Sequence, residues 1–200
     1  MKKFLLSIIL IFSFLSCAMS DDISDFQIDG YTLQESLLKY YSEDELKSNW
    51  NWEKKGYGFK SKKYFKFAFK IKNPGLYERK IVIYTSRKDK EYKIQSITAF
   101  AYFPNNIAEC YNEQLKLSTK FESKFPNTKK NVKEYSNPHD KFGESTEKDI
   151  IFLFDDGSEA GIACLDWGPK YTKKFKSQDH MQVFLDTKGY AEWLKGPAYK

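Results

Sequence analysis

A short apolar segment at the start of the chain constrains the fold most, because it sets the compartment in which the protein folds. Two lysines precede an apolar run over residues 4–15, and an A-x-A-like site follows at residues 18–20. These three parts together are typical of a secretory signal peptide. A permanent transmembrane helix needs about 20 apolar residues, so the run is too short to be one. We therefore expect residues 1–20 to be removed and residues 21–200 to fold as one domain in the periplasm or outside the cell.

Cys17 allows a second interpretation of the same segment, in which the chain is cut before a cysteine that then carries lipid. A lipoprotein signal usually has Leu, a small residue and Gly, Ala or Ser before the cysteine. Of the residues before Cys17, only Ser16 fits that pattern. The sequence thus favours a soluble product and leaves an outer-membrane lipoprotein as the alternative. Neither route leaves a transmembrane span after processing.

Both routes leave the same two cysteines, Cys110 and Cys164. An exported chain with an even number of cysteines favours a disulfide. This one would close a loop of about 55 residues, and the lost chain entropy is worth about 4 kcal/mol. The alternative is a reactive thiol nucleophile, which needs a nearby base, and the only histidines are His139 and His180. We predict the disulfide.

Capping boxes and helical spacing predict four helices. Thr32 with Glu35, and Ser42 with Glu45, each match the capping-box pattern at the start of a helix. The apolar stripe of the longest of the four contains Cys110, Leu115 and Phe121, so the Cys110 thiol should face the sheet. The predicted helices cover residues 33–41, residues 43–48, residues 107 to about 125, and a short stretch after Thr187.

Alternating apolar and polar residues predict the strands. Phe65, Phe67 and Phe69 alternate with lysines, and the Asp-Gly pair within residues 155–158 marks a hairpin turn. Residues 127–147 are polar and are expected to form a long loop that can include one edge strand. The predicted strands cover residues 65–71, 79–86, 92–103, 150–154, 159–167 and 181–186. The resulting order, α-βββ-α-βββ-α, predicts an α+β fold in which helices pack on an antiparallel sheet.

Four stretches of the chain carry a resemblance to other proteins. They are Phe26 to Gly30, Tyr41-Ser42-Glu43, Glu109-Cys110-Tyr111 and Cys164-Leu165-Asp166-Trp167. In these the sequence resembles small exported proteins of marine bacteria with AT-rich genomes. The resemblance implies export and spans most of the mature chain, but it implies no activity.

The positive charge is concentrated in one segment. Residues 21–59 carry 4 basic and 9 acidic side chains, whereas residues 60–93 carry 12 basic and 3 acidic ones. Alternation in the first predicted strand places Lys66, Lys70 and Lys72 on one outer face, where they can bind an anionic envelope component or a protein partner. The competing interpretation is a solvated strand face whose lysines discourage edge pairing. Nucleic acid is not an expected partner for an exported chain.

Four aromatic residues, Trp50, Trp52, Tyr57 and Phe59, lie close together in the sequence. They can form a platform for a sugar ring or a peptide. Because 18% of the chain is aromatic, packing in the core under the edge of the sheet is the competing interpretation.

Known catalytic and cofactor motifs do not occur in the sequence. Ser158 directly follows Gly157, so this stretch is a hairpin turn rather than a nucleophile elbow. One group of residues has the chemistry of metal ligands but no defined spacing, which favours a solvated loop over a weak divalent-cation site: His139, Asp140, Glu144, Glu147 and Asp149. No catalytic residue, metal ligand or cofactor is assigned.

The sequence as a whole predicts an exported, non-catalytic binding or cell-envelope interaction module. The alternatives are an envelope hydrolase whose site the sequence does not reveal and a lipid-anchored structural protein. A deep pocket with convergent polar groups and perturbed acids would favour an enzyme. An exposed aromatic or charged patch without such a pocket would favour a binding module.

Overall fold

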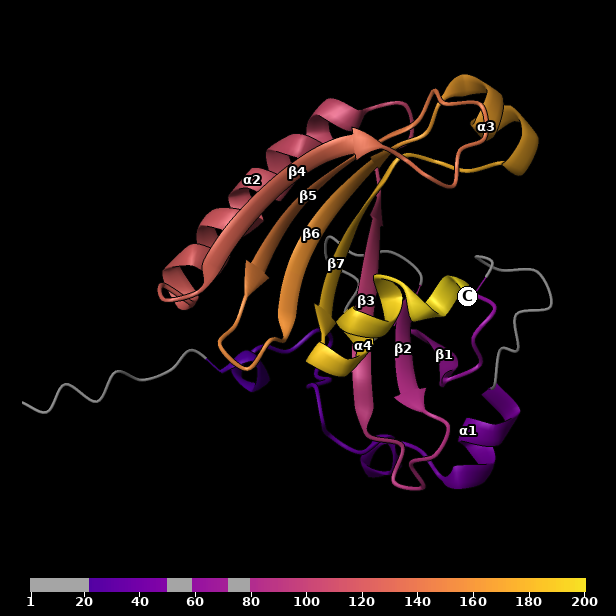
Figure 1. Ribbon diagram of the computed structural model, residues 1–200, viewed down its shortest axis with the longest axis vertical. Coiled ribbons are helices and arrows are strands. Elements are labelled where there is room, and N and C mark those ends of the chain that lie inside the picture. The colour runs from indigo at the N-terminus through magenta and orange to yellow at the C-terminus, as the bar shows by residue number, and fades with distance from the viewer. Residues whose placement is uncertain (1–21, 50–58, 72–79) are drawn as a thin grey trace, which may run out of the picture.

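The computed structural model describes residues 22–49, 59–71 and 80–200, and within them seven strands form one antiparallel sheet (Figure 1). The strand order across the sheet is β1-β2-β3-β7-β6-β5-β4. The strands are β1 (Tyr64–Lys70), β2 (Lys80–Ser86), β3 (Ile94–Tyr102), β4 (Lys129–Ser136), β5 (Thr146–Leu153), β6 (Glu159–Asp166) and β7 (His180–Asp186). The predicted α+β fold with an antiparallel sheet is therefore confirmed.

Two three-stranded meanders make up the sheet, and one strand joins them. β1, β2 and β3 follow one another in space as they do in the chain, and so do β4, β5 and β6. β7 pairs with β3 on one side and with β6 on the other. The Asp-Gly hairpin predicted between residues 154 and 158 joins β5 to β6, with Gly157 at a φ of +83°.

One face of the sheet, which we call the α2 face, is covered by the long helix α2 (Ile107–Lys124). Asn106 caps the helix, and its amide oxygen accepts a hydrogen bond from the backbone of Glu109. Strands β4 to β7 arch over the inside of the molecule, and α2 lies on the outside of this arch (Figure 1). The helix buries Cys110, Gln114, Ser118 and Phe121. The predicted apolar stripe is correct at Cys110 and Phe121 but wrong at Leu115, which is 57% exposed.

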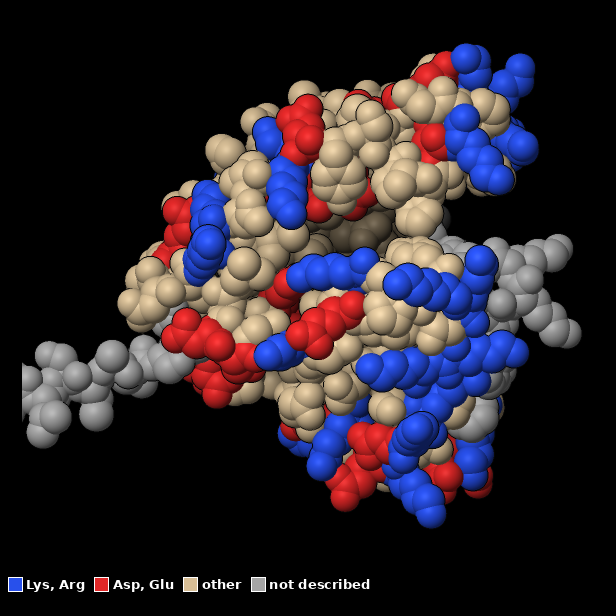
Figure 2. All heavy atoms as spheres, in the orientation of Figure 1, with Lys and Arg blue, Asp and Glu red and all other residues tan. Residues whose placement is uncertain are grey.

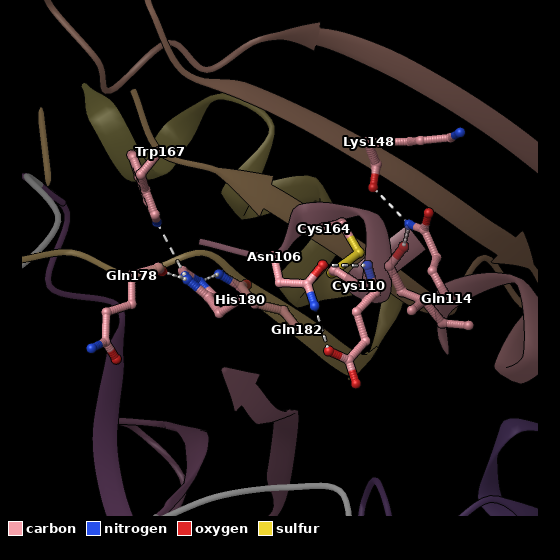
Figure 3. The surroundings of a disulfide bond; sticks show 11 residues. Asn106, Cys110, Gln114, Lys148, Cys164, Trp167, Gln178, His180 and Gln182 are labelled. Atoms are coloured by element: carbon pink, nitrogen blue, oxygen red, sulfur yellow. Dashed lines mark hydrogen bonds between the residues drawn. A yellow bond between two sulfur atoms is a disulfide. The ribbon is translucent and has the colours of Figure 1, made fainter. Parts of the chain in front are cut away.

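The predicted disulfide joins α2 to β6 through Cys110 and Cys164, whose Cα atoms lie 6.1 Å apart (Figure 3). Both cysteines are fully buried. One helical turn further on, the side-chain amide of Gln114 donates hydrogen bonds of 2.7 Å to the carbonyls of Lys148 and Ile162. A disulfide and two hydrogen bonds thus fix the same helix to the neighbouring strands β5 and β6.

The amino-terminal segment covers the part of the α2 face that α2 itself does not reach. It contains the short helices η1 (Ile23–Asp25), η2 (Leu37–Lys39) and α1 (Glu43–Asn49). Tyr31, Leu37 and Leu46 are fully buried in the core cluster that also holds Phe67. The predicted short helix after Ser42 is confirmed, together with its capping box to Glu45.

The predicted helix over residues 33–41 is wrong. Gln34 adopts a φ of +65°, and its N–H donates to the carbonyl of Ile94. The carboxylate of Glu35, which a capping box would turn back toward Thr32, instead binds Lys39 and the Tyr40 hydroxyl. Pairing with the start of β3 therefore replaces all but the three-residue turn η2.

The opposite face of the sheet, which we call the cleft face, is partly covered by the carboxy-terminal helices α4 (Lys188–Leu194) and η3 (Pro197–Tyr199). The hydroxyl of Thr187 caps α4, as predicted. Tyr190 and Trp193 of α4 pack against Tyr64 of β1 with ring centroids 5.0 and 4.9 Å apart. α4 therefore lies beneath the arch, on the inner side of the sheet (Figure 1).

Two further elements differ from the predicted order. The polar segment over residues 127–147, which is expected to be a long loop with at most one edge strand, contains the edge strand β4, so four strands rather than three follow α2. Helix α3 (Pro169–Phe175) was not predicted. No helix in the described parts of the chain is long and apolar enough to cross a membrane.

Candidate functional site

A cleft of about 360 Å³ opens on the cleft face. Side chains from all seven strands line it, and α4 and η3 form its wall opposite the sheet. Figure 2 shows it as a hollow between α4 and the arch of β4 to β7, with acidic atoms visible at its upper edge. A concave site of this size with mixed polar and apolar walls is typical of small-molecule binding.

Strand alternation decides which residues reach the cleft. Ile150 and Phe152 of β5 are buried on the α2 face, so Glu147, Asp149 and Ile151 point to the other side. The pairing registers then set these residues beside those of the neighbouring strands. The rows across the sheet are Tyr135–Glu147–Leu165–His180, Lys133–Asp149–Ala163–Gln182, Ile151–Gly161–Phe184–Thr98 and Glu159–Asp186–Ser96–Tyr84.

The first two rows bring a pair of acids to one end of the cleft. The Tyr135 hydroxyl donates to Oδ2 of Asp149 at 2.8 Å, and the Asn137 amide donates to Oε2 of Glu147 at 2.9 Å. Burial, together with repulsion from Asp149, raises the pKa of Glu147 to about 7. Burial also raises the pKa of Asp149. The hydrogen bond from Tyr135 and the charge of Lys133 act in the other direction and lower this pKa. We call these two carboxyls with Tyr135 and Asn137 the acidic end.

The last row forms a second acidic group beneath α4. Asp186 lies directly opposite Glu159 in the β6–β7 register, and Glu159 forms an ion pair with Lys195 just after α4. Burial and the nearby Glu159 charge raise the pKa of Asp186 to about 7, against a Ser96 hydrogen bond and the Lys195 charge. We call Glu159, Asp186 and Lys195 the paired end.

An apolar floor separates the two ends. The ring of Phe184 lies over Gly161, so closely that a Cβ atom at residue 161 would come within 2.1 Å of the ring. Ile151 and Ala163 flank this position on the neighbouring strands. Glycine is therefore required at residue 161, because only a residue without a side chain leaves room for the ring.

Two carboxylate oxygens at the cleft are buried without a hydrogen-bond donor among the described residues. They are Oδ1 of Asp149 and Oδ1 of Asp186. Their residues are 8% and 4% exposed and line the cleft. Buried polar atoms almost always have a partner, so these two are candidates for contact with a bound molecule.

The predicted lysine patch is only partly described, because Lys72 lies outside the described residues. Lys66 lines the cleft, and Lys70 is exposed at the end of β1. The acidic amino-terminal segment covers the opposite face of β1, against Phe67 and Phe69. Residues 22–49 of that segment therefore lie on the other side of β1 from the lysine face, and binding of an anionic partner to that face stays a prediction.

The predicted aromatic platform is also only partly described, since Trp50, Trp52 and Tyr57 lie outside the described residues. Phe59 packs against Trp193 and Tyr199 with ring centroids 5.0 and 5.4 Å apart. It also lines the cleft, so this aromatic residue belongs to the wall that α4 and η3 form.

The residues considered as metal ligands do not converge. The Asp140 carboxylate accepts hydrogen bonds from the backbone and hydroxyl of Ser145 within its own loop, and Glu144 pairs with Lys170. Only His139, Glu147 and Asp149 reach the cleft. Among the described ranges, no three His, Cys, Asp or Glu residues are grouped so that they could hold a metal ion.

Neither Cys110 nor Cys164 is available as a nucleophile, because the two form the disulfide. Burial lowers the pKa of His180, and its ring is held by the Gln178 carbonyl and by Trp167 and Gln182 (Figure 3). The Ser158 hydroxyl donates to Asp156 in the β5–β6 turn, as expected of a hairpin serine. His180 is thus held by Trp167 and Gln182, which line the cleft, rather than placed beside a nucleophile.

Sequence reasoning assigned Glu147 and Asp149 to a polar loop and did not single out Glu159 or Asp186. A signal for the first pair was present: the two acids alternate with Lys148 and Ile150 ahead of the apolar end of β5. The second pair carries no local signal, because only the β6–β7 register brings its members together.

Comparison of the chain with protein-family models, with curated proteins and with solved structures finds no match.

Proposed function

We propose that the protein is an exported binding protein and that the cleft is the site where it holds a small organic ligand. The observation that carries the proposal is a cleft of about 360 Å³ whose apolar floor lies between two groups of buried or partly buried carboxyls. Apolar surface supplies affinity, and a few fixed polar groups supply orientation and specificity. The signal-like amino terminus and the disulfide support export.

The geometry favours a small ligand over a large partner. The site is recessed under α4, and its floor residue Phe184 is only partly exposed. The backbone N–H groups of Lys60 and Ser61 both donate to the carbonyl of Ala198, which ties the α4–η3 wall to the chain ahead of β1. A preformed recess of this kind binds a small molecule without a large ordering cost.

Filling the cleft tests this function. Thr98 is a partly exposed cleft residue, so we expect Thr98→Trp to occupy the space above Phe184. Thr119→Trp is the matched control, because Thr119 is exposed on α2. Native mass spectrometry of the protein isolated from its exporting cells should show a retained small molecule in wild type and in Thr119→Trp, and its loss in Thr98→Trp. Equal retention in all three proteins would place the ligand elsewhere.

A hydrolase is the second candidate, and the raised pKa of Glu147 favours it. A carboxyl with a pKa of about 7 can donate a proton at neutral pH, and Asp149 lies two residues away on the same strand face. In this scheme, protonated Glu147 acts as general acid on an envelope polymer. Incubation with isolated cell-wall glycan would release reducing ends with wild type and not with Glu147→Gln. A lack of product from wild type over a full pH series would exclude this candidate.

A further inference from the structure

We propose that the cleft takes an organic cation, with a protonated amine at Glu147 and Asp149 and an apolar body over Phe184. This inference names the ligand class of the proposed binding site and rests on that proposed function. It follows from four features of the cleft: its charge, its unsatisfied oxygen atom, its aromatic walls and the way the chain fills its other end.

The acidic end holds more negative charge than its surroundings balance. The two carboxyls receive hydrogen bonds from neutral groups, the Tyr135 hydroxyl and the Asn137 amide. Lys133 lies across from Asp149 in the β4–β5 register and is exposed to solvent. The other titratable side chains that line this end are His139 and Tyr199. The chain has 33 Lys and Arg side chains against 27 Asp and Glu, so a buried acid beside a partly buried one at a cleft is a local exception to its positive charge.

Asp149 has one buried oxygen atom whose hydrogen-bonding capacity is not used by the described residues. Its Oδ2 atom is bound by Tyr135, whereas its Oδ1 atom has no hydrogen-bond donor among the described residues. The residue is more than nine-tenths buried and lines the cleft. A protonated amine carries several N–H donors and no acceptor, which matches acidic oxygens that lack donors.

Aromatic rings stand beside the two acids. Tyr135 and Tyr199 both line the cleft and each keeps 39% of its surface exposed, so their rings are accessible to a ligand. The ring of His139 lies 6.0 Å from that of Tyr199. Aromatic faces attract cations, and the combination of carboxylates with aromatic rings is therefore suited to an organic ammonium group.

The paired end shows how this surface accepts an ammonium group. Lys195 places its own amine against Glu159, so that end already has its cation. Asp149 and Glu159 lie two rows apart along the strands, which corresponds to about 13 Å. The free cation position is thus at the acidic end, and the apolar floor extends from it toward Phe184. A ligand with one amine and one apolar or aromatic body fits this arrangement.

Two probes of similar shape but different charge can show how much the charge of the ligand contributes to binding. 2-Phenylethylamine and 2-phenylethanol have the same body, but one carries an ammonium group and the other a hydroxyl. Titrations would follow carboxyl and tyrosine NMR signals at pH 8 and low salt, where the acids are ionised. We expect the amine to bind at least about tenfold more tightly than the alcohol, because only the amine neutralises the acidic end.

Three charge variants locate the effect. Glu147→Gln and Asp149→Asn should each weaken binding of the amine by about tenfold and leave binding of the alcohol unchanged. Glu134→Gln is the control, because Glu134 is exposed on β4 and pairs with Lys148 on the α2 face. It should bind both probes as wild type does. Near-ultraviolet circular dichroism would confirm that each variant is folded.

Equal affinity for the amine and the alcohol, with both lost in Thr98→Trp, would overturn the cation inference and leave the cleft as a binding site. Failure of both probes to shift the Tyr135, Glu147 or Asp149 signals would also overturn it. The proposed function would then be decided by the native mass spectrometry comparison above, which does not depend on the charge of the ligand.

Discussion

The two faces of the sheet are built from the same strands, but the side chains on them make different kinds of contact. On the α2 face, buried apolar side chains, the Cys110–Cys164 bond and the Gln114 amide satisfy the contacts between helix and sheet. On the cleft face, the same strands present buried carboxyls, two of which keep an oxygen atom without a donor among the described residues. Satisfied contacts stabilise the fold, whereas unsatisfied buried groups cost stability and are typical of sites that bind something else. The contacts on the α2 face thus stabilise the fold, and those on the cleft face suit the binding function that we propose.

The largest expected effect comes from the α2 face. Replacing both cysteines (Cys110→Ser with Cys164→Ser) removes a link across a sequence separation of 54 residues. We expect the free energy of unfolding to fall by up to about 4 kcal/mol in denaturant titrations. Binding of 2-phenylethylamine below the unfolding transition should not change. If the double serine variant kept its stability but lost binding, the assignment of stability to the α2 face and of binding to the cleft face would be wrong.

The next effect depends on pH and comes from the cleft face. Glu147 and Asp186 both have a pKa of about 7, so the folded protein holds these protons more tightly than the unfolded chain does. Their contribution to stability is therefore complete below pH 4, and it is lost as the pH rises through 7. We expect stability to fall by on the order of 2 kcal/mol for each group between pH 5 and pH 8.

Thermal unfolding of Asp186→Asn tests that assignment. Asparagine does not titrate, so the variant should lose a smaller part of its stability over the same pH range. Serine substitution of the two cysteines on the α2 face should leave the pH dependence as it is in wild type. An unchanged pH dependence in Asp186→Asn would show that the titration belongs to other groups.

A smaller effect is expected from adding one methyl group to the floor of the cleft. Gly161→Ala would force the Phe184 ring toward the cleft, because the new Cβ would lie 2.1 Å from it. We expect a stability loss of about 1.5 kcal/mol and weaker binding of 2-phenylethylamine. Gly189→Ala is the matched control, since no atom lies within 4 Å of its added Cβ. Equal behaviour of the two variants would show that the floor of the cleft is not rigid.

The smallest effect is expected on the solvent side of α2. Lys116 pairs with Glu113 one turn away, and the Lys116 side chain is 67% exposed. We expect Lys116→Ala to lower the free energy of unfolding by about 0.3 kcal/mol or less, which urea titrations can bound. A larger loss would mean that the stabilising role of α2 extends beyond its buried stripe.

The fold was predictable where the local pattern and the burial agree. Phe67 and Phe69 alternate in sequence and are buried together, and Cys110 lies on the buried face of its helix. The prediction failed at residues 33–41, where backbone pairing of Gln34 with Ile94 outweighs a local capping signal. The spacing of residue types along the sequence does not predict contacts between residues that are so far apart in the chain.

The candidate site was less predictable than the fold for the same reason. Asp186 and Glu159 meet only because β6 and β7 pair in one register, and Lys195 reaches them from beyond α4. A shift of one residue in that register would turn one of the two acids to the opposite face of the sheet from the other. Strand pairing therefore decides which residues meet at the two ends of the cleft, and the residue types at these positions do not predict that pairing.

The position of β7 determines the order in which this protein can assemble. The strand lies between the two meanders, yet it is the last of the seven to be synthesised, and it pairs residue 96 with residue 186. Until it is available, β3 and β6 each expose an open edge beside an apolar face, and such edges recruit other chains. A chain that stops before His180 would consist of two half-sheets with no strand to pair them. Premature termination or slow release should therefore lead to aggregation rather than to a smaller folded unit.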